Sequence, residues 1–353
     1  MILLAILSFI LTAVLMPFVR QKALNAGFLD RPDFRKRHDT PVPPVGGLVI
    51  IPVFVGLSYF AGLDMSANFY FLMALALVWI VGALDDLFHV PALTKFGLHM
   101  IAATILVLGN DTIVYYLGDL FGFGEIWTEP LAIVFSMLCV VFLINAVNMI
   151  DGLDGLSSGI LLIMLMALSC AAQIVGGHEL LPVMMVLMGA VCGFMLYNYR
   201  HFFRDKACVF MGDSGSTSLG VIMAWLVIEL SQDTLQMKPG LLHPALIAWI
   251  LSLPVFDTLS LFIYRMIQKR SPFSPDRRHL HYLVCDRGLS IERTVNLMQA
   301  MTLFYAAVGV VGILVFHISI PILMSLWVAL FWLHFSVTFG AAQWVLRKVM
   351  NSY

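Results

Sequence analysis

The sequence predicts an all-α protein that crosses a lipid bilayer about eleven times and forms one integral membrane domain. Of its 353 residues, 61% are hydrophobic and only 12% are charged. Apolar stretches long enough to span a hydrocarbon core recur from one end of the chain to the other. The expected spans are 1–19, 44–62, 69–84, 96–109, 128–147, 159–176, 180–197, 216–231, 242–264, 295–316 and 319–342.

The positions of lysine and arginine predict how these spans are oriented. When the connecting loops alternate between two sides, almost every basic residue falls on one side, and Lys238 is the exception. Positive charge is retained on the cytoplasmic side, so we expect the N-terminus outside and the C-terminus inside. Residues 1–19 lack a basic leader and a cleavage site, which favours a first span over a signal peptide. The inward loops that carry candidate chemistry lie near residues 20–45, 85–95, 148–158, 198–215 and 265–294.

The third expected span ends in two adjacent carboxylates, Asp85 and Asp86. They repel each other, and they lie at a helix C-terminus, where the dipole is already negative. Such a pair persists where a cation or a proton-transfer role compensates for the repulsion. A solvated loop start is the alternative interpretation. Lys95 follows where the next span begins.

Four polar residues at three-residue spacing follow the apolar run 131–144 of the fifth expected span, namely Asn145, Asn148, Asp151 and Asp154. On a helix the two asparagines share a face, and the intervening glycines let the aspartates turn into a pocket. Groups that bind a metal or a sugar are costly at a membrane surface unless they are used. Helix capping is the alternative, but it accounts for one or two of the four residues.

The segment around Asp213 is a glycine-rich turn into an expected helix. Free N–H groups and the helix dipole favour phosphate at such a position, and an aspartate there can hold a divalent cation that bridges to the phosphate. A simple N-cap is the alternative. The segment lacks the GxxxxGK[ST] pattern, so a nucleoside triphosphatase loses support.

Two further features lie toward the C-terminus. Asp257 falls inside a span, where an ionisable group is a functional candidate, although pairing with a neighbouring helix explains it equally well. The last large inward loop carries Arg277, Arg278, His279 and His281. The arginines can bind phosphate or carboxylate bidentately, and the histidines could contact a diphosphate or a sugar. Zinc is disfavoured without nearby thiolates, and a solvated basic loop is the alternative.

Together these motifs resemble the polyprenyl-phosphate N-acetylhexosamine-1-phosphate transferases. The matching patterns are the double aspartate at 85–86, NxxNxxDGxDGL at 145–156, FMGDxGS at 210–216 and the histidines at 279–281. The last loop is most similar to that of the bacterial UDP-GlcNAc:undecaprenyl-phosphate GlcNAc-1-phosphate transferases. Phospho-N-acetylmuramoyl-pentapeptide transferases carry three consecutive histidines there. Tyr282 departs from the subgroup pattern, in which a further histidine often follows.

The resemblance implies a role for each matching residue. Asp213 would ligate Mg²⁺, with Mn²⁺ as the alternative ion, and Asn148 would be a second contact. Phe210 would stack on uracil, and Asp154 would hydrogen-bond the nucleoside. The other assignments are Asp85, Asp86 and Asp151 to the chemistry, and Asn145, Lys95, Arg277, Arg278, His279 and His281 to the substrates.

The resemblance therefore implies transfer of GlcNAc-1-phosphate from UDP-GlcNAc to undecaprenyl phosphate, with release of UMP, on the cytoplasmic face of a bacterial inner membrane. Such a reaction begins enterobacterial common antigen and many O-antigen chains. We expect no nucleic-acid partner, and a homodimer is a candidate assembly. The same chemistry on another UDP-N-acetylhexosamine, such as UDP-MurNAc-pentapeptide, and lipid transport are the alternatives. The transferase hypothesis requires the carboxylates of Asp86, Asp151 and Asp213 to converge.

Overall fold

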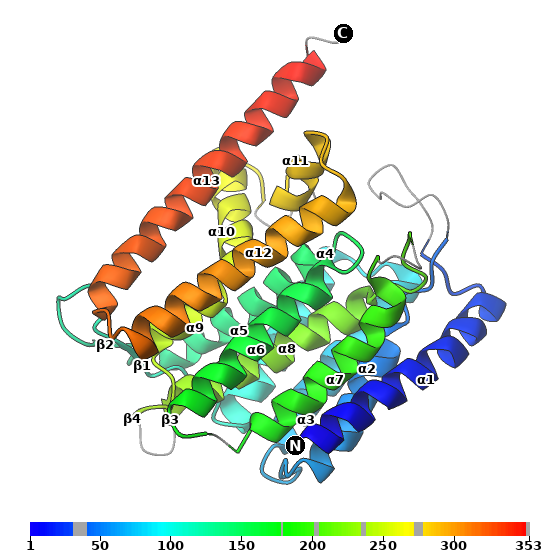
Figure 1. Ribbon diagram of the computed structural model, residues 1–353, viewed down its shortest axis with the longest axis horizontal. Coiled ribbons are helices and arrows are strands. Elements are labelled where there is room, and N and C mark those ends of the chain that lie inside the picture. Colours follow the sequence, from blue (N-terminus) through cyan, green and yellow to red (C-terminus); the bar gives the residue numbers. More distant parts are fainter. Residues whose placement is uncertain (31–40, 178, 201–204, 234–237, 272–277, 351–353) are drawn as a thin grey trace.

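The computed structural model is a bundle of long helices, and it describes residues 1–30, 41–177, 179–200, 205–233, 238–271 and 278–350 (Figure 1). The helices are α1 (Ile2–Ala26), α2 (Gly46–Phe60), α3 (Phe69–Phe88), α4 (Ala92–Thr104), α5 (Ala132–Ile150), α6 (Leu156–Ile174), α7 (Leu181–Asn198), α8 (Gly212–Ser231), α9 (Pro244–Ile250), α10 (Ser252–Ile267), α11 (Leu280–Asp286), α12 (Ile291–Val310) and α13 (Ile320–Met350). Short π-helical turns, η1 (Ile105–Gly109) and η2 (Val311–Val315), extend α4 and α12. Two antiparallel pairs of short strands, β1 (Tyr116–Gly118) with β2 (Ile126–Trp127) and β3 (Gln232–Asp233) with β4 (Lys238–Pro239), lie at one end of the bundle.

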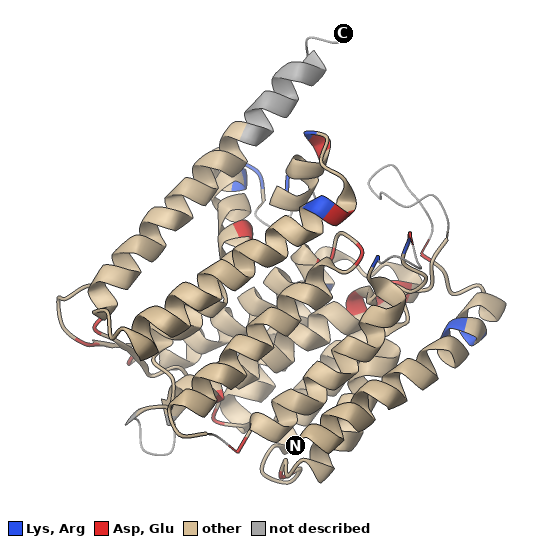
Figure 2. Cartoon of the chain, in the orientation of Figure 1, with Lys and Arg blue, Asp and Glu red and all other residues tan. Residues whose placement is uncertain are grey.

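The predicted class, a polytopic helical membrane protein, is confirmed. In the described part of the chain, nine helices are long and apolar enough to cross a membrane, and the bent pair α9–α10 can count as a tenth. Helix α2 is also apolar but has only 15 residues. Each expected span overlaps one of these helices, while the count of eleven and the orientation of the termini stay predictions. Figure 2 shows the coloured Lys and Arg positions gathered at the end of the bundle opposite the strands.

Helix α8 is the most deeply buried helix of the bundle. Over an apolar stretch of 18 residues in each helix, 94% of the residues are buried in α8, against 17% in α1 and 22% in α13. The last two helices lie at opposite edges of the bundle (Figure 1). The first two turns of α8 carry glycine, serine and threonine rather than large side chains. Small residues let neighbouring backbones approach closely, which is how helices pack where lipid provides no hydrophobic driving force.

Glycines on the neighbouring helices complete this close packing. A Cβ at Gly47 on α2 would collide with the backbone of Gly215, and one at Gly82 on α3 would lie 2.5 Å from Ser214 Cα. The amino end of α8 is therefore held between α2 and α3 at backbone contact. Any chemistry carried by this end of α8 has a fixed position relative to the end of α3.

The span formed by α9 and α10 is broken. Helices α9 and α10 meet at an angle of 78° around Leu251. Trp327 of α13 covers the break, because its indole N–H lies 3.1 Å from the Ala248 carbonyl and 2.9 Å from Ser252 Oγ. A backbone carbonyl freed by the break is thus satisfied by a side chain, as burial in a membrane requires.

The close crossing at Gly47 generates a stability prediction. Gly47→Ala should destabilise the protein by about 1–3 kcal/mol, because the added methyl group meets backbone that cannot move aside. Gly56→Ala is the matched control on the same helix, since a Cβ there has no atom within 4 Å, and alanine also has the better helix propensity. Thermal unfolding in detergent measures both variants, and equal stability of the two would contradict the packing argument.

Candidate active site

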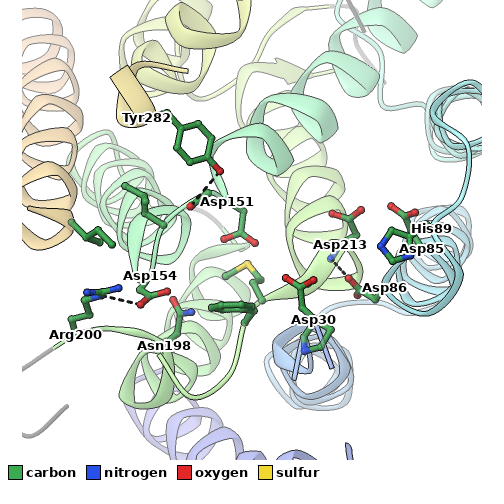
Figure 3. Close-up of a pocket in the computed structure, with 17 residues that line it drawn as sticks. Asp30, Asp85, Asp86, His89, Asp151, Asp154, Asn198, Arg200, Asp213 and Tyr282 are labelled. Atoms are coloured by element: carbon green, nitrogen blue, oxygen red, sulfur yellow. Dashed lines mark hydrogen bonds and ion pairs between the residues drawn. The ribbon is translucent and has the colours of Figure 1, made fainter. Parts of the chain in front are cut away.

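A cavity of about 350 Å³ opens at the basic end of the bundle (Figure 3). It lies where the end of α3, the α5–α6 connection, the segment before α8 and the start of α11 come together. The lining residues are Asp30, Pro44, Asp85, Asp86, His89, Asp151, Gly152, Leu153, Asp154, Asn198, Arg200, Phe210, Met211, Gly212, Asp213, Tyr282 and Ile291. The required convergence of Asp86, Asp151 and Asp213 is therefore present.

The charge of this cavity is unbalanced. Among the described residues that line it, six are aspartates and one, Arg200, carries a fixed positive charge. Carboxylates that share a poorly solvated space oppose one another's ionisation, so each needs a compensating partner. The partners differ from one aspartate to the next.

Asp86 caps helix α8. The backbone N–H groups of Asp213 and Ser214 donate to its two carboxylate oxygens at 2.8 and 3.1 Å. Gly212 makes the approach possible, because its φ of 74° suits glycine and a Cβ there would lie 2.6 Å from Asp86 Oδ2. The anion site predicted at this helix N-terminus exists, but the anion that occupies it is the protein's own carboxylate.

Lys95 links Asp85 to Asp213. Its ammonium group lies 2.8 Å from Asp85 Oδ2 and also pairs with Asp213 Oδ2. The other oxygen of Asp85 accepts the backbone N–H of Val90 at 2.6 Å, which shapes the turn after α3. The predicted phosphate contact, Lys95, is therefore engaged with two carboxylates of the site.

Asn148 holds the other side of Asp213. Its amide nitrogen donates to Asp213 Oδ1 at 2.6 Å and to Ser216 Oγ at 2.9 Å. Asn145, one turn earlier on α5, instead donates to the Val141 carbonyl of its own helix at 2.7 Å. Neither asparagine is among the described residues that line the cavity, and Asn148 reaches the site through its hydrogen bond to Asp213.

A divalent cation fits Asp213 only with help from a substrate. In the described residues no three His, Cys, Asp or Glu side chains are grouped to hold a metal by themselves. Mg²⁺ usually takes one or two carboxylates, with waters and substrate phosphates completing its shell. Asp213, with Asp85 beside it across Lys95, supplies such a partial set. Asn148 could join only by presenting its amide oxygen instead of its nitrogen.

The connection between α5 and α6 positions Asp151 and Asp154. Asp151 accepts a hydrogen bond from Ser157 Oγ at 2.6 Å, while Asp154 accepts one from Arg200 Nε at 2.8 Å and one from the Ala207 N–H at 3.1 Å. Gly155 has a φ of 77°, which allows the chain to turn into α6. The two aspartates thus face the cavity from one short loop but in different surroundings.

Burial raises the pKa of Asp151 to about 7. The hydrogen bond from Ser157 opposes this rise, and the negative charges of Asp213 and Asp154 add to it. Asp151 lies outside the helices, in the loop that connects α5 to α6. A carboxyl group with this pKa exchanges its proton near neutral pH, which suits a general acid or base.

The histidine segment lies behind the cavity wall. His279 Nδ1 is 2.8 Å from Asp257 Oδ2, which answers the open question about Asp257 in favour of pairing. Arg278 donates to Gln268 Oε1 at 3.0 Å, and its guanidinium lies 5.0 Å from the ring centroid of Tyr264. Neither His279, His281 nor Arg278 is among the described lining residues. Arg277 lies outside the described residues.

Phe210 does line the cavity, as its predicted role requires. Its backbone is held by the loop before α2, because its N–H donates to the Pro43 carbonyl at 3.0 Å and its carbonyl accepts the Gly46 N–H at 2.9 Å.

Five lining residues with polar side chains were not predicted from the sequence, namely Asp30, His89, Asn198, Arg200 and Tyr282. Arg200 was visible only as part of a basic run. Asn198 carries a backbone role, since it accepts the Gly155 N–H at 2.8 Å.

The chain is similar to known proteins over most of its length. Residues 68–231, which include Asp85, Asp151 and Asp213, match the model of glycosyl transferase family 4. The undecaprenyl-phosphate alpha-N-acetylglucosaminyl 1-phosphate transferase of Escherichia coli K12 is 30% identical over 86% of this chain and 82% of its own length. The corresponding protein of Salmonella typhi is 30% identical, over 86% and 81%. A probable undecaprenyl-phosphate N-acetylglucosaminyl 1-phosphate transferase of Bacillus subtilis is also 30% identical, over 87% and 83%.

The pKa of Asp151 generates a pH prediction for protein treated with a chelator. Because the folded-state pKa of about 7 lies above the ordinary aspartate value of 3.8, the folded protein binds one more proton than the unfolded chain between these two pH values. The stability that this proton contributes is then lost as pH rises toward 7. Asp151→Asn removes this loss, so the variant should gain thermal stability over wild type as pH rises from 5 and reach a plateau above about 7. A difference in unfolding temperature that does not change with pH would contradict the assignment.

Proposed function

The chain belongs to glycosyl transferase family 4, alongside the bacterial undecaprenyl-phosphate N-acetylglucosaminyl 1-phosphate transferases, and we propose that it transfers GlcNAc-1-phosphate from UDP-GlcNAc to undecaprenyl phosphate. The products are undecaprenyl-diphospho-GlcNAc and UMP. The observation that carries the proposal is the meeting of Asp86, Asp151 and Asp213, from three separate segments, in one cavity at the end of a membrane bundle. The proposed setting is the cytoplasmic face of the inner membrane, and the product would begin enterobacterial common antigen or O-antigen chains.

The charge balance of the site supports a metal-assisted reaction. Both substrates are anions, and the cavity that must receive them is itself rich in carboxylates. Asp213, with Asp85 and Asn148 next to it, would hold Mg²⁺, for which Mn²⁺ could substitute. When bound, the ion supplies positive charge to the diphosphate of the donor, the main requirement of phosphoryl transfer. Lys95 neutralises the same carboxylates from the side of α4.

The reaction itself is an exchange of one phosphoanhydride for another. An oxygen of the lipid phosphate forms a bond to the β-phosphorus of the donor, and the bond from that phosphorus to the oxygen of UMP breaks. Asp151 is suited to accept a proton from the lipid phosphate, because its pKa of about 7 lies close to that of a phosphate monoester. We favour a single in-line displacement over a two-step route through an aspartyl-phosphate on Asp85 or Asp86, since Asp86 already caps α8.

The nucleoside side of the cavity is proposed to lie at Phe210 and Asp154. Phe210 would stack on uracil, and Asp154 would act with Arg200, which it orients at 2.8 Å. Arg200 also lies 3.2 Å from Glu292 Oε1, so its direction is set by two carboxylates. A guanidinium held in this way can bind a phosphate or a carbonyl oxygen of the donor.

Two alternatives make different demands on the structure. A lipid transporter would place polar groups along a path through the bundle, whereas six aspartates here share one cavity at one end and Asp257 is the exception within a span. A related UDP-N-acetylhexosamine, such as UDP-MurNAc-pentapeptide, would use the same cavity. Incubating membranes with each labelled donor and following UMP release distinguishes these alternatives.

Asp213→Asn should lower UMP release about 10³-fold, the scale of losing one strong electrostatic stabiliser of a transition state. The substitution keeps the size of the side chain but weakens its hold on a cation. Glu229→Gln is the matched control, because Glu229 is the carboxylate at the other end of α8, where it accepts a hydrogen bond from Thr112 at 3.1 Å. A chelator should abolish wild-type activity, and Mg²⁺ should restore it. Full activity of Asp213→Asn would remove the metal assignment.

The orientation can be tested independently of activity. A reporter fused at Arg277 should score as cytoplasmic and one at Lys238 as periplasmic, because basic loops are retained inside. Cysteine labelling from outside the cell should then modify a cysteine placed at 238 and spare one placed at 277. The opposite pattern would overturn the proposed side of the active site.

A further inference from the structure

Asp257 is a buried carboxylate that the proposed reaction does not use. It lies on α10, two turns beyond the break with α9, and is only 1% exposed. One oxygen lies 2.8 Å from His279 Nδ1, and the other accepts the backbone N–H of Leu280 at 2.9 Å. Both carboxylate oxygens therefore interact with residues at the start of α11.

Three neighbouring rings lead from His279 to the loop between α5 and α6. His279 and His281 stack with ring centroids 5.4 Å apart and planes at 21°, and the ring centroids of His281 and Tyr282 lie 4.2 Å apart with planes at 52°. Tyr282 lines the cavity together with Gly152, whose carbonyl lies 3.5 Å from the tyrosine hydroxyl. In Figure 3 this hydroxyl points to the loop that carries Asp151.

Gly152 shows how tightly this stack rests on the loop. A Cβ at position 152 would collide with His281 Nε2 and would lie 2.9 Å from the Tyr282 hydroxyl. Only glycine leaves room for the imidazole, so a shift of the histidines is passed directly to the backbone next to Asp151. The loop between α5 and α6 is thus braced from outside the cavity.

We propose that Asp257 is a positioning residue for the transfer reaction: through the His279, His281 and Tyr282 rings it fixes the loop that carries Asp151 and Asp154. The inference rests on the proposed function for its effect on turnover, but the contacts that link Asp257 to this loop do not depend on that function. It gives His279, which is only 6% exposed, an indirect role instead of a direct contact with the donor diphosphate. It also connects the broken span to the active site.

The hydrogen bond to Asp257 sets the tautomer of His279. A carboxylate oxygen only accepts, so this hydrogen bond places a proton on Nδ1, and in the neutral form of the ring Nε2 is the unprotonated nitrogen. In Asp257→Asn the amide can keep the Leu280 hydrogen bond through its oxygen while its NH₂ group faces Nδ1. The proton then moves to Nε2. This variant therefore changes the brace without creating a cavity or an isolated buried charge.

The test compares Asp257→Asn with Ser260→Ala, which removes a buried polar group from the same helix. Side-chain ¹⁵N NMR of histidine-labelled protein in detergent should report the tautomer change, and the Gly152 amide resonance should shift with it. We expect kcat to fall about 10- to 100-fold, the usual cost of losing a group that orients a functional residue. The KM for the donor should change little, and Ser260→Ala should match wild type in every reading.

A double-mutant cycle with Gly152→Ala tests the path of the effect. If the brace acts through Gly152, the losses of the two substitutions in kcat should be far from additive. Additive losses, or a changed tautomer with wild-type kcat, would overturn the proposal. So would an unshifted Gly152 resonance, and this reading remains decisive if wild type itself releases no UMP. If Asp257→Asn does not accumulate, His279→Gln removes the ring that Asp257 holds, and its Gly152 resonance is read in the same way.

Discussion

Repulsion among carboxylates is the constraint on which the rest of this structure depends. Six aspartates line one cavity of about 350 Å³, and a poorly solvated space of that size does not tolerate six unpaired charges. The amino end of α8 compensates Asp86, and Lys95 compensates both Asp85 and Asp213. The carboxylates and the groups that compensate them lie on α3, α4 and α8. These helices must therefore keep their relative positions for the charges to coexist.

The close packing of α8 satisfies that requirement. Gly47 and Gly82 bring α2 and α3 to backbone contact with the first turn of α8, and Gly212 admits the Asp86 carboxylate to the two free N–H groups. Larger residues would move the cap away from the helix end, and Asp86 would become an uncompensated charge. The electrostatics and the packing are therefore one property of this region, because the small residues allow the short distances on which the charge pairing relies.

The sequence predicted the identity of this site better than its internal contacts. The helical class, the spans and the meeting of Asp86, Asp151 and Asp213 followed from hydropathy, charge sorting and motif resemblance. The partner of Asp86 did not, since the cap joins residues 127 positions apart and nothing local announces it. Asn145 and Asn148 share a face of α5 as their spacing predicted, but that spacing did not show that Asn148 bonds to Asp213 while Asn145 bonds to its own helix. Asp257 could be identified as unusual, but only the bend between α9 and α10 brings it to His279.

A common arrangement explains why so many acidic residues are compatible with both architecture and chemistry. Asp85, Asp86, Asp154 and Asp257 each accept a backbone N–H from a neighbouring loop or helix end. A carboxylate offers about four lone-pair positions, so an oxygen that holds a loop can still face a cation or a proton. Under the proposed function, replacing any of these residues should lower activity whether its role is chemical or architectural. The two roles separate only through a second quantity, such as the affinity of the protein for Mg²⁺ or the tautomer of His279, because geometry and charge act on these quantities differently.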